Sequence, residues 1–192
     1  MSVQVEHSRI AQRPKRADAR RNYDNLISAG REAFTEKGKS ASLEDIARRA
    51  GVGIGTLYRH FPTRQDLLEA VYVEEVEGVC RSADELEDRP PWDALATWLH
   101  TLLAYAGTKH ALTDELFEHL DRDAELFTLC RTALLATAEP LLARAQESGV
   151  ARADVRAEDM MYMVGGIARA ATTREDTHRI LDIALDGLRY RA

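Results

Sequence analysis

Side chains that can donate hydrogen bonds gather in one short stretch of the chain: Thr56, Tyr58, Arg59 and His60. Hydroxyl, guanidinium and imidazole groups at this spacing suit phosphate oxygens and the polar edges of nucleic-acid bases. Ile54 and Gly55 stand directly before them. They allow a close approach, and Ile54 offers an apolar contact for a thymine methyl group. This chemistry requires a scaffold that presents the stretch at a surface.

Two short helices are predicted to form that scaffold. The first begins at Ser42, a good N-cap, and stops at Gly51, a residue suited to a helix C-terminus. The second covers residues 55–61 and ends at Pro62. Two short helices joined by a glycine-containing turn form a helix-turn-helix. Small and aliphatic residues supply the expected contact between them: Ile46, Ala47, Ala50, Val52 and Leu57.

Charge divides the chain into a basic head and an acidic body. Residues 1–64 hold 13 Lys and Arg against 7 Asp and Glu, a net +6, whereas residues 65–192 hold 13 against 25, a net −12. A polyanion would therefore bind the head and be repelled by the body, which favours one docking orientation.

The chain is divided accordingly into three parts. Residues 1–17 are expected to be a flexible basic arm, residues 18–64 the helix-turn-helix domain, and residues 65–192 a second helical domain. The arm carries Arg13, Lys15 and Arg16, which could reach an adjacent minor groove or could serve only as a polar tail.

Apolar periodicity predicts helices over the rest of the chain. Tyr23, Ile27, Gly30 and Phe34 form one helical stripe, with Gly38 as its stop. Thr63 caps a long helix expected to reach about residue 86. Further helices are expected at 92–106, 114–120, 124–146 with a kink or restart at Pro140, 158–171 and 174–190. About nine helices and no period-2 strand indicate an all-α fold.

Several other classes of protein are disfavoured. No phosphate-binding glycine loop, HExxH or GxSxG motif is present, so we expect neither an enzyme nor a bound cofactor. Cys80 and Cys130 form no CxxC pair and are expected to be packed thiols, with a redox sensor as the alternative. Glu115, His119 and Asp123 fit one helical face, but a solvated stripe is the stronger interpretation, so no metal site is expected. No apolar run approaches the ~18 residues of a membrane span, and the amino terminus lacks a signal-peptide pattern.

The segment from Ala50 to Phe61, preceded by Ile46 and Ala47, resembles the signature of the TetR family of repressors. The resemblance covers residues 20–70 in detail and implies double-stranded DNA as the partner. It places Ser42 and Arg48 at the DNA backbone and groove edge. It assigns base contacts to Gly53, Ile54, Gly55, Thr56 and Arg59, and phosphate contacts to Tyr58, His60 and Arg64. The family often has Ser followed by Lys or Arg where this chain has Gly53 and Ile54, which removes two polar contacts.

The last two helices are the expected homodimer interface. They carry small and aliphatic residues over more than one face, which exceeds what a singly covered helix needs. The residues expected at the interface are Met163, Gly166, Ile167, Ala170, Ile180, Ala184 and Leu188. The resemblance also implies a four-helix interface here, and the alternative is that both helices belong to the core.

Large side chains in the second domain are candidates for a small-molecule pocket. They are Trp98, Leu102, Tyr105, Phe117, His119, Phe127, Met161 and Tyr162. The alternative is that these residues are ordinary core.

The resulting hypothesis is a cytoplasmic, nucleoid-associated dimeric repressor that an unidentified effector releases from a palindromic operator. The alternative is a DNA-binding activator or architectural protein without an inducer.

Overall fold

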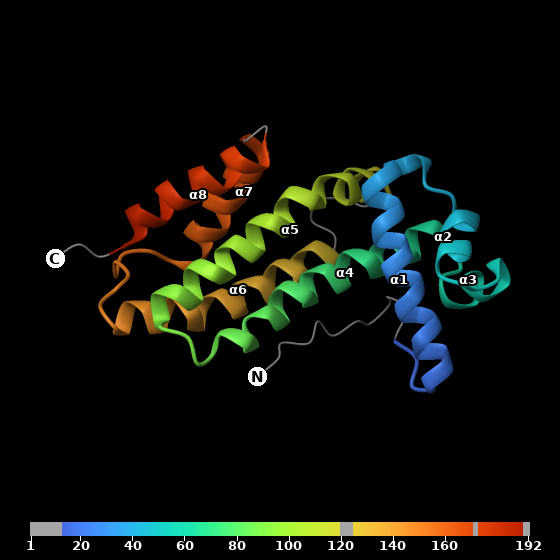
Figure 1. Ribbon diagram of the computed structural model, residues 1–192, viewed down its shortest axis with the longest axis horizontal. Coiled ribbons are helices and arrows are strands. Elements are labelled where there is room, and N and C mark those ends of the chain that lie inside the picture. The colour runs from blue at the N-terminus through green and yellow to red at the C-terminus, as the bar shows by residue number, and fades with distance from the viewer. Residues whose placement is uncertain (1–12, 120–124, 171–172, 190–192) are drawn as a thin grey trace. The chain divides into compact units, whose positions relative to one another are not determined.

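The computed structural model describes residues 13–119, 125–170 and 173–189. Over these ranges it contains eight α-helices and two 3₁₀ turns (Figure 1), and no strand beyond one isolated bridge between Ala151 and Arg189. In chain order they are α1 (Ala17–Lys37), η1 (Gly38–Ser40), α2 (Leu43–Arg49), α3 (Ile54–His60), α4 (Arg64–Ser82), η2 (Asp84–Leu86), α5 (Pro91–His119), α6 (Glu125–Glu147), α7 (Ala157–Ala170) and α8 (Arg174–Leu188). The predicted all-α class is confirmed.

One predicted break does not occur. The helices expected at 92–106 and 114–120 form a single helix, α5, because the intervening residues contain no proline. Gly107 lies inside it, and a lone glycine costs a helix only about 1 kcal/mol. A kink or a restart was expected at Pro140, and no new helix begins there, since α6 continues through that residue. The chain therefore has eight helices over its described ranges where nine were expected.

The described residues form two compact units. The head unit comprises residues 13–75, 108–119 and 125–128, and the body unit comprises residues 76–107, 129–170 and 173–189. The expected stripe of α1 lies in the head unit, where Tyr23, Ile27, Gly30 and Phe34 are all buried. Fully buried side chains from the other elements complete this core: Ile46, Leu57, Phe61, Leu67 and Val71.

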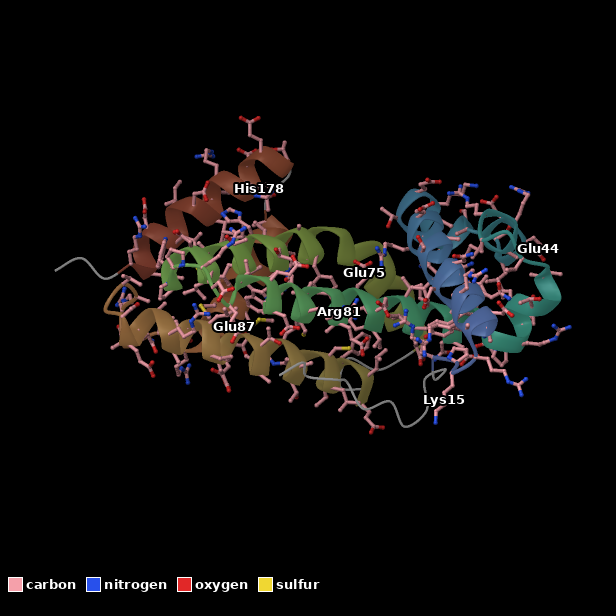
Figure 2. The ribbon with its side chains drawn as sticks, turned by 60° about the horizontal axis from the view of Figure 1, so that its bottom comes forward. Lys15, Glu44, Glu75, Arg81, Glu87 and His178 are labelled. Carbon is pink, nitrogen blue, oxygen red and sulfur yellow. The ribbon has the colours of Figure 1, made fainter. Side chains whose placement is uncertain are left out.

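The body unit is organised around Trp98 of α5. Its side chain is completely buried, and its indole N–H donates a 3.1 Å hydrogen bond to the carbonyl of Val79. α7 and α8 pack side by side (Figure 1). His178 of α8 (Figure 2) lies with its Nδ1 3.2 Å from that of His100 on α5.

Among the described helices, α6 has the length and apolar composition of a membrane span. Core packing accounts for that composition, because Ala138, Leu141 and Leu142 are buried in the body unit. α6 ends at a Schellman motif, in which Gly149 has a φ of 71° and Val150 donates to the carbonyl of Ala145.

Trp98→Phe should lower the free energy of unfolding by about 1–3 kcal/mol, because it removes the indole hydrogen bond and leaves space in a fully buried site. The Val79 carbonyl keeps the hydroxyl of Ser82, which donates to it at 2.7 Å. Urea unfolding at fixed protein concentration measures this loss. Trp92→Phe is the matched control, since Trp92 is only half-buried with its ring facing the Arg189 guanidinium at 4.8 Å. Equal effects of the two substitutions would contradict the assignment of Trp98 as the core anchor.

Candidate nucleic-acid interface

The turn between α2 and α3 is built by backbone hydrogen bonds. Gly51 takes a φ of 70°, a conformation that side-chain-bearing residues rarely adopt. Its N–H donates to the carbonyl of Arg48, and the N–H of Val52 donates to that of Ala47, which completes a Schellman motif. Gly53 then caps α3. The predicted roles of Ser42 and Gly51 in bounding α2 are thus confirmed.

α3 has one buried side and one exposed side. Leu57 and the following Phe61 are fully buried, as expected for core positions. Ile54 and Tyr58 are 37% and 46% exposed. Arg59 is exposed beside them. The helix therefore presents an isoleucine, a phenol and a guanidinium to the outside.

Gly53, the N-cap of α3, and Gly55, in its first turn, are both exposed. No heavy atom of the described chain beyond their immediate neighbours lies within 4 Å of where a Cβ would stand at either position. The fold itself would therefore accommodate a side chain there. Glycine at these positions leaves the backbone of α3 open to close approach by another molecule.

Ser42, the N-cap of α2, and Arg48, on that helix, each have a partner within the head unit. The hydroxyl of Ser42 accepts the N–H of Asp45 at 3.1 Å, which caps the helix. The side chain of Arg48 is 78% exposed and forms an ion pair with Asp45. Both side chains thus lie at the surface with one internal partner each.

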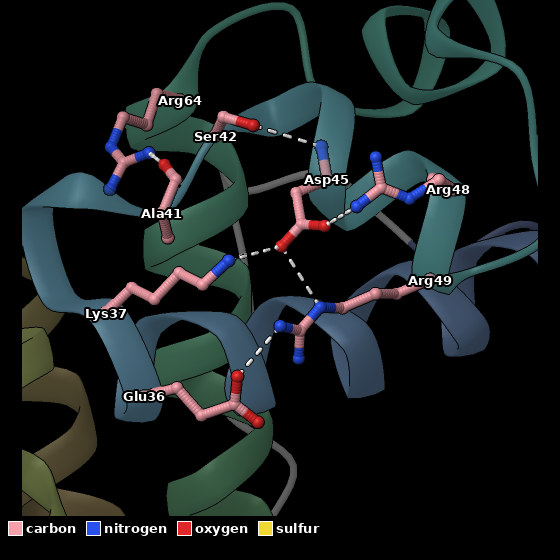
Figure 3. A network of polar contacts seen from close by, with 8 residues as sticks. All are labelled: Glu36, Lys37, Ala41, Ser42, Asp45, Arg48, Arg49 and Arg64. Carbon is pink, nitrogen blue, oxygen red and sulfur yellow. Dashed lines mark hydrogen bonds and ion pairs between the residues drawn. The ribbon is translucent and has the colours of Figure 1, made fainter.

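Asp45 is the centre of a polar network that joins α1 to α2 (Figure 3). Its carboxylate is buried and accepts from Lys37 Nζ at 3.0 Å and from Arg49 Nε at 3.1 Å, in addition to Arg48. Arg49 also bonds Glu36 at 2.8 Å. The hydrogen bond from Lys37, more than any other contact, holds the pKa of Asp45 below its ordinary value, so this carboxylate is ionised at neutral pH.

In the sequence, Asp45 stands three residues after the N-cap Ser42, in the first turn of a helix, where an acid is common. Its spacing to Arg48 and Arg49, three and four residues on, was a visible signal for intrahelical pairing. Its contact with Lys37 depends on how α1 packs against α2 and has no signal in the local pattern.

His60 lies at the carboxyl end of α3 against the core aromatics. Its ring meets Tyr23 edge-on, with the centroids 6.1 Å apart. Burial, and to a smaller extent the charge of Arg59, lowers the pKa of His60. The imidazole is therefore neutral at pH 7 and can still donate one hydrogen bond.

Arg64 points into the head unit. Its guanidinium donates to the carbonyls of Ala41 and Gly38, the latter at 3.2 Å, and lies 4.9 Å above the ring of Phe34. Of the basic arm, residues 1–12 lie outside the described part. Arg13 makes a two-pronged ion pair with Asp24 at 2.9 and 2.7 Å, and Lys15 and Arg16 are exposed.

The side chains predicted for a pocket fall in different surroundings. Trp98, Leu102 and Tyr105 are buried and Met161 is half-buried, whereas Tyr162 is 66% exposed and receives a hydrogen bond from Arg131. Phe127 belongs to the head unit, where its ring stands edge-on to Tyr72. The side chains of Phe117 and His119 lie outside the described residues. The pocket stays a prediction.

The residues predicted for the dimer interface line α7 and α8. Gly166 and Ala170 are exposed, and the others are half-buried: Met163, Ile167, Ile180, Ala184 and Leu188. Ile183, another apolar residue of α8, is 62% exposed.

Comparison with known proteins identifies the chain. Residues 26–71 match the model of bacterial regulatory proteins of the tetR family, and residues 90–190 match the model of the SbtR-like transcriptional regulator C-terminal domain. The chain belongs to the TetR family. It is thus a TetR-family DNA-binding transcriptional regulator, and its α2–α3 pair lies within the matched N-terminal region.

Solved structures of TetR regulators agree with this assignment. SCO0520 of Streptomyces coelicolor is 37% identical with a TM-score of 0.79, and the match covers 88% of this chain and 99% of that one. A TetR regulator of Mycobacterium vanbaalenii is 32% identical with a TM-score of 0.75, over 92% and 100% of the two chains. The regulator SAR0097 of Staphylococcus aureus is 41% identical over 85 residues, which span 42% of this chain and only 44% of that protein.

Asp45 should make the head sensitive to acid. Because its pKa is lowered in the folded state, its stabilising contribution is present above the pKa of an unfolded aspartate, about 4, and is lost as the pH falls below that value. Asp45→Asn should lower the melting temperature at pH 7 and reduce its further fall between pH 5 and pH 3. Thermal unfolding across this range measures both effects.

Asp154→Asn is the matched control, because Asp154 forms a solvent-exposed pair with Arg152. Exposed pairs contribute little to stability. An Asp45→Asn protein that melts like this control at pH 7 would contradict the importance of the buried network.

Proposed function

We propose that this regulator is a homodimeric repressor that binds a palindromic operator in double-stranded DNA and is released by a small-molecule effector. The observation that carries the proposal is the outer side of α3, where Ile54, Gly55, Tyr58 and Arg59 are exposed together on a helix whose opposite side is core. Helix-turn-helix proteins place such a helix in the major groove. The proposed site of action is the cytoplasm, at the nucleoid.

In this proposal the exposed side of α3 divides its contacts between bases and backbone. Ile54, Thr56 and Arg59 approach base edges, with Gly53 and Gly55 giving room. Tyr58 and His60 donate to phosphates, as do Ser42 and Arg48 of the first helix. The net positive charge of residues 1–64 supports this orientation, since phosphate attraction supplies much of the affinity of DNA-binding proteins.

A palindromic operator requires a two-fold dimer, and α7 and α8 are the proposed interface. Tyr162 and Ile183 expose large apolar surface on these helices, and Gly166 and Ala170 permit close helix approach. The same patch would meet itself across the two-fold axis. A partner copy would remove these side chains from water.

The effector is proposed to bind among the large side chains of the body unit. Trp98, Leu102, Tyr105 and Met161 supply apolar surface there. Small-molecule sites of helical domains are mostly apolar with a few polar groups. Binding would favour a spacing of the two heads that no longer fits the operator.

Selection from a random duplex library tests the DNA proposal. We expect an enriched palindrome, bound with an affinity that falls steeply with salt. Arg59→Ala should weaken binding to it by about 5- to 150-fold and relax selectivity at one position of each half-site, because one base contact is lost. Arg156→Ala, an exposed arginine paired with Asp159 in the body unit, should leave affinity unchanged. No enriched sequence, or equal effects of the two substitutions, would contradict the proposal.

Gly166→Arg should convert the dimer to a monomer without unfolding the chain. A Cβ at Gly166 meets no heavy atom within 4 Å beyond its near neighbours, so the single chain has room for a side chain there. The proposed helix–helix interface has no room for an arginine at this position. Light scattering at micromolar concentration measures the mass. Gly107→Arg, at another exposed helical glycine with open space, is the control and should stay dimeric. A monomeric wild-type protein would refute the dimer.

A further inference from the structure

We propose that Arg64 is a positioning residue for DNA binding, which holds the start of α2 through backbone carbonyls and does not grip a phosphate itself. Its guanidinium donates from one nitrogen to Ala41 and from the other to Gly38 at 3.2 Å and Lys39 at 3.4 Å. This inference rests on the proposed operator binding.

Only arginine can make this set of contacts. Its planar fork presents several N–H donors in fixed directions, whereas the lysine ammonium is a single compact charge. The flat face of the same guanidinium lies 4.9 Å above the ring of Phe34, a residue that is fully buried in α1. The side chain thus joins the end of α1 and the following turn at one point.

The carbonyls it binds lie in the connection between α1 and α2. The 38–41 segment contains the short turn η1, where the Gly38 carbonyl also accepts the N–H of Ala41 at 3.1 Å. Ala41 directly precedes Ser42, the N-cap of α2. Fixing the Ala41 carbonyl (Figure 3) therefore fixes the point from which the first helix of the DNA-binding pair begins.

The base of the Arg64 side chain is itself held firmly. In the first turn of α4, Thr63 donates its N–H to Asp66 at 2.8 Å, and the Asp66 N–H donates back to the Thr63 hydroxyl at 3.1 Å. Two helical turns after Arg64, α4 packs against α1 so closely that a Cβ at Gly30 would lie 3.2 Å from Val71. Arg64 thus links α2 to two helices that are already locked together.

These contacts conflict with the phosphate role that the family resemblance implies for Arg64. Three hydrogen bonds to backbone carbonyls and the contact with the Phe34 ring fix the guanidinium inside the DNA-free head, so its position is set by the protein and not by a phosphate. If Arg64 acts through Ala41, its charge is unimportant to DNA affinity and its fork is essential.

Arg64→Lys and Arg64→Gln separate the two roles, because the first keeps the charge and both lose the fork. Affinity for the selected operator and for an unrelated duplex is measured between 50 and 200 mM salt, at a temperature where circular dichroism shows each variant folded. We expect both variants to lose about tenfold in operator affinity, comparable with one misplaced base contact. Affinity for the unrelated duplex and the salt slope should be unchanged, and Arg156→Lys should behave as wild type.

Hydrogen exchange of the DNA-free proteins provides an independent arm. Both Arg64 variants should exchange faster over residues 38–46 than the wild type. If the wild type selects no operator, only the proposed function is contradicted. Unaltered exchange over residues 38–46 in the Arg64 variants would separately contradict the proposal that Arg64 positions the start of α2.

Three results would overturn the proposal. The first is an Arg64→Lys protein that binds like the wild type, together with an Arg64→Gln protein that binds both duplexes more weakly and has a salt slope smaller by about 0.9. This pair of results would show that Arg64 contacts a phosphate. Unaltered operator affinity in both variants would show that the contacts are dispensable. A lowered melting temperature with an unchanged ratio of operator to unrelated-duplex affinity would reduce Arg64 to a purely structural residue.

Discussion

Helices of seven residues are not stable alone in water, and both α2 and α3 are of that length. What this regulator does with DNA therefore depends on the contacts that hold the pair to its neighbours. Ile46 and Leu57 supply buried apolar surface, which has no direction. The bonds from Lys37 to Asp45 and from Arg64 to Ala41 supply direction, since they fix where α2 begins and how it faces α1.

The charged side chains of the head fall into two groups, those paired inside the unit and those exposed on α3. The buried carboxylate of Asp45 pairs with Lys37, Arg48 and Arg49, so its negative charge is neutralised within the head. Arg59 and the polar groups of α3 are left on the outside. The net negative charge of residues 65–192 would oppose docking of DNA on that part of the chain. Internal pairing and long-range charge thus favour the same orientation on DNA.

The sequence was most informative where structure is local. Ser42, Gly51 and Thr63 mark helix ends through contacts with residues two to four positions away, and all three were predicted. The continuous α5 was missed because short apolar periods on either side of Gly107 look like two helices. The Lys37–Asp45 and Arg64–Ala41 contacts join different elements, so no periodic pattern reports them. A dimer interface or an effector pocket depends on a second molecule. For these surfaces the sequence shows only that the residues are apolar, and not what covers them.

Hydroxyl-radical footprinting of the protein, read by mass spectrometry with and without operator DNA, tests the central claim most directly. The head exposes Ile54 and Tyr58, and the body unit exposes Tyr162 and Ile183, so reactive side chains report on both the proposed DNA surface and the proposed dimer surface. The account predicts that DNA slows oxidation of Ile54 and Tyr58 and leaves Tyr162 and Ile183 unchanged. Oxidation of Ile54 and Tyr58 at an unaltered rate on bound DNA would contradict reading of the operator by α3.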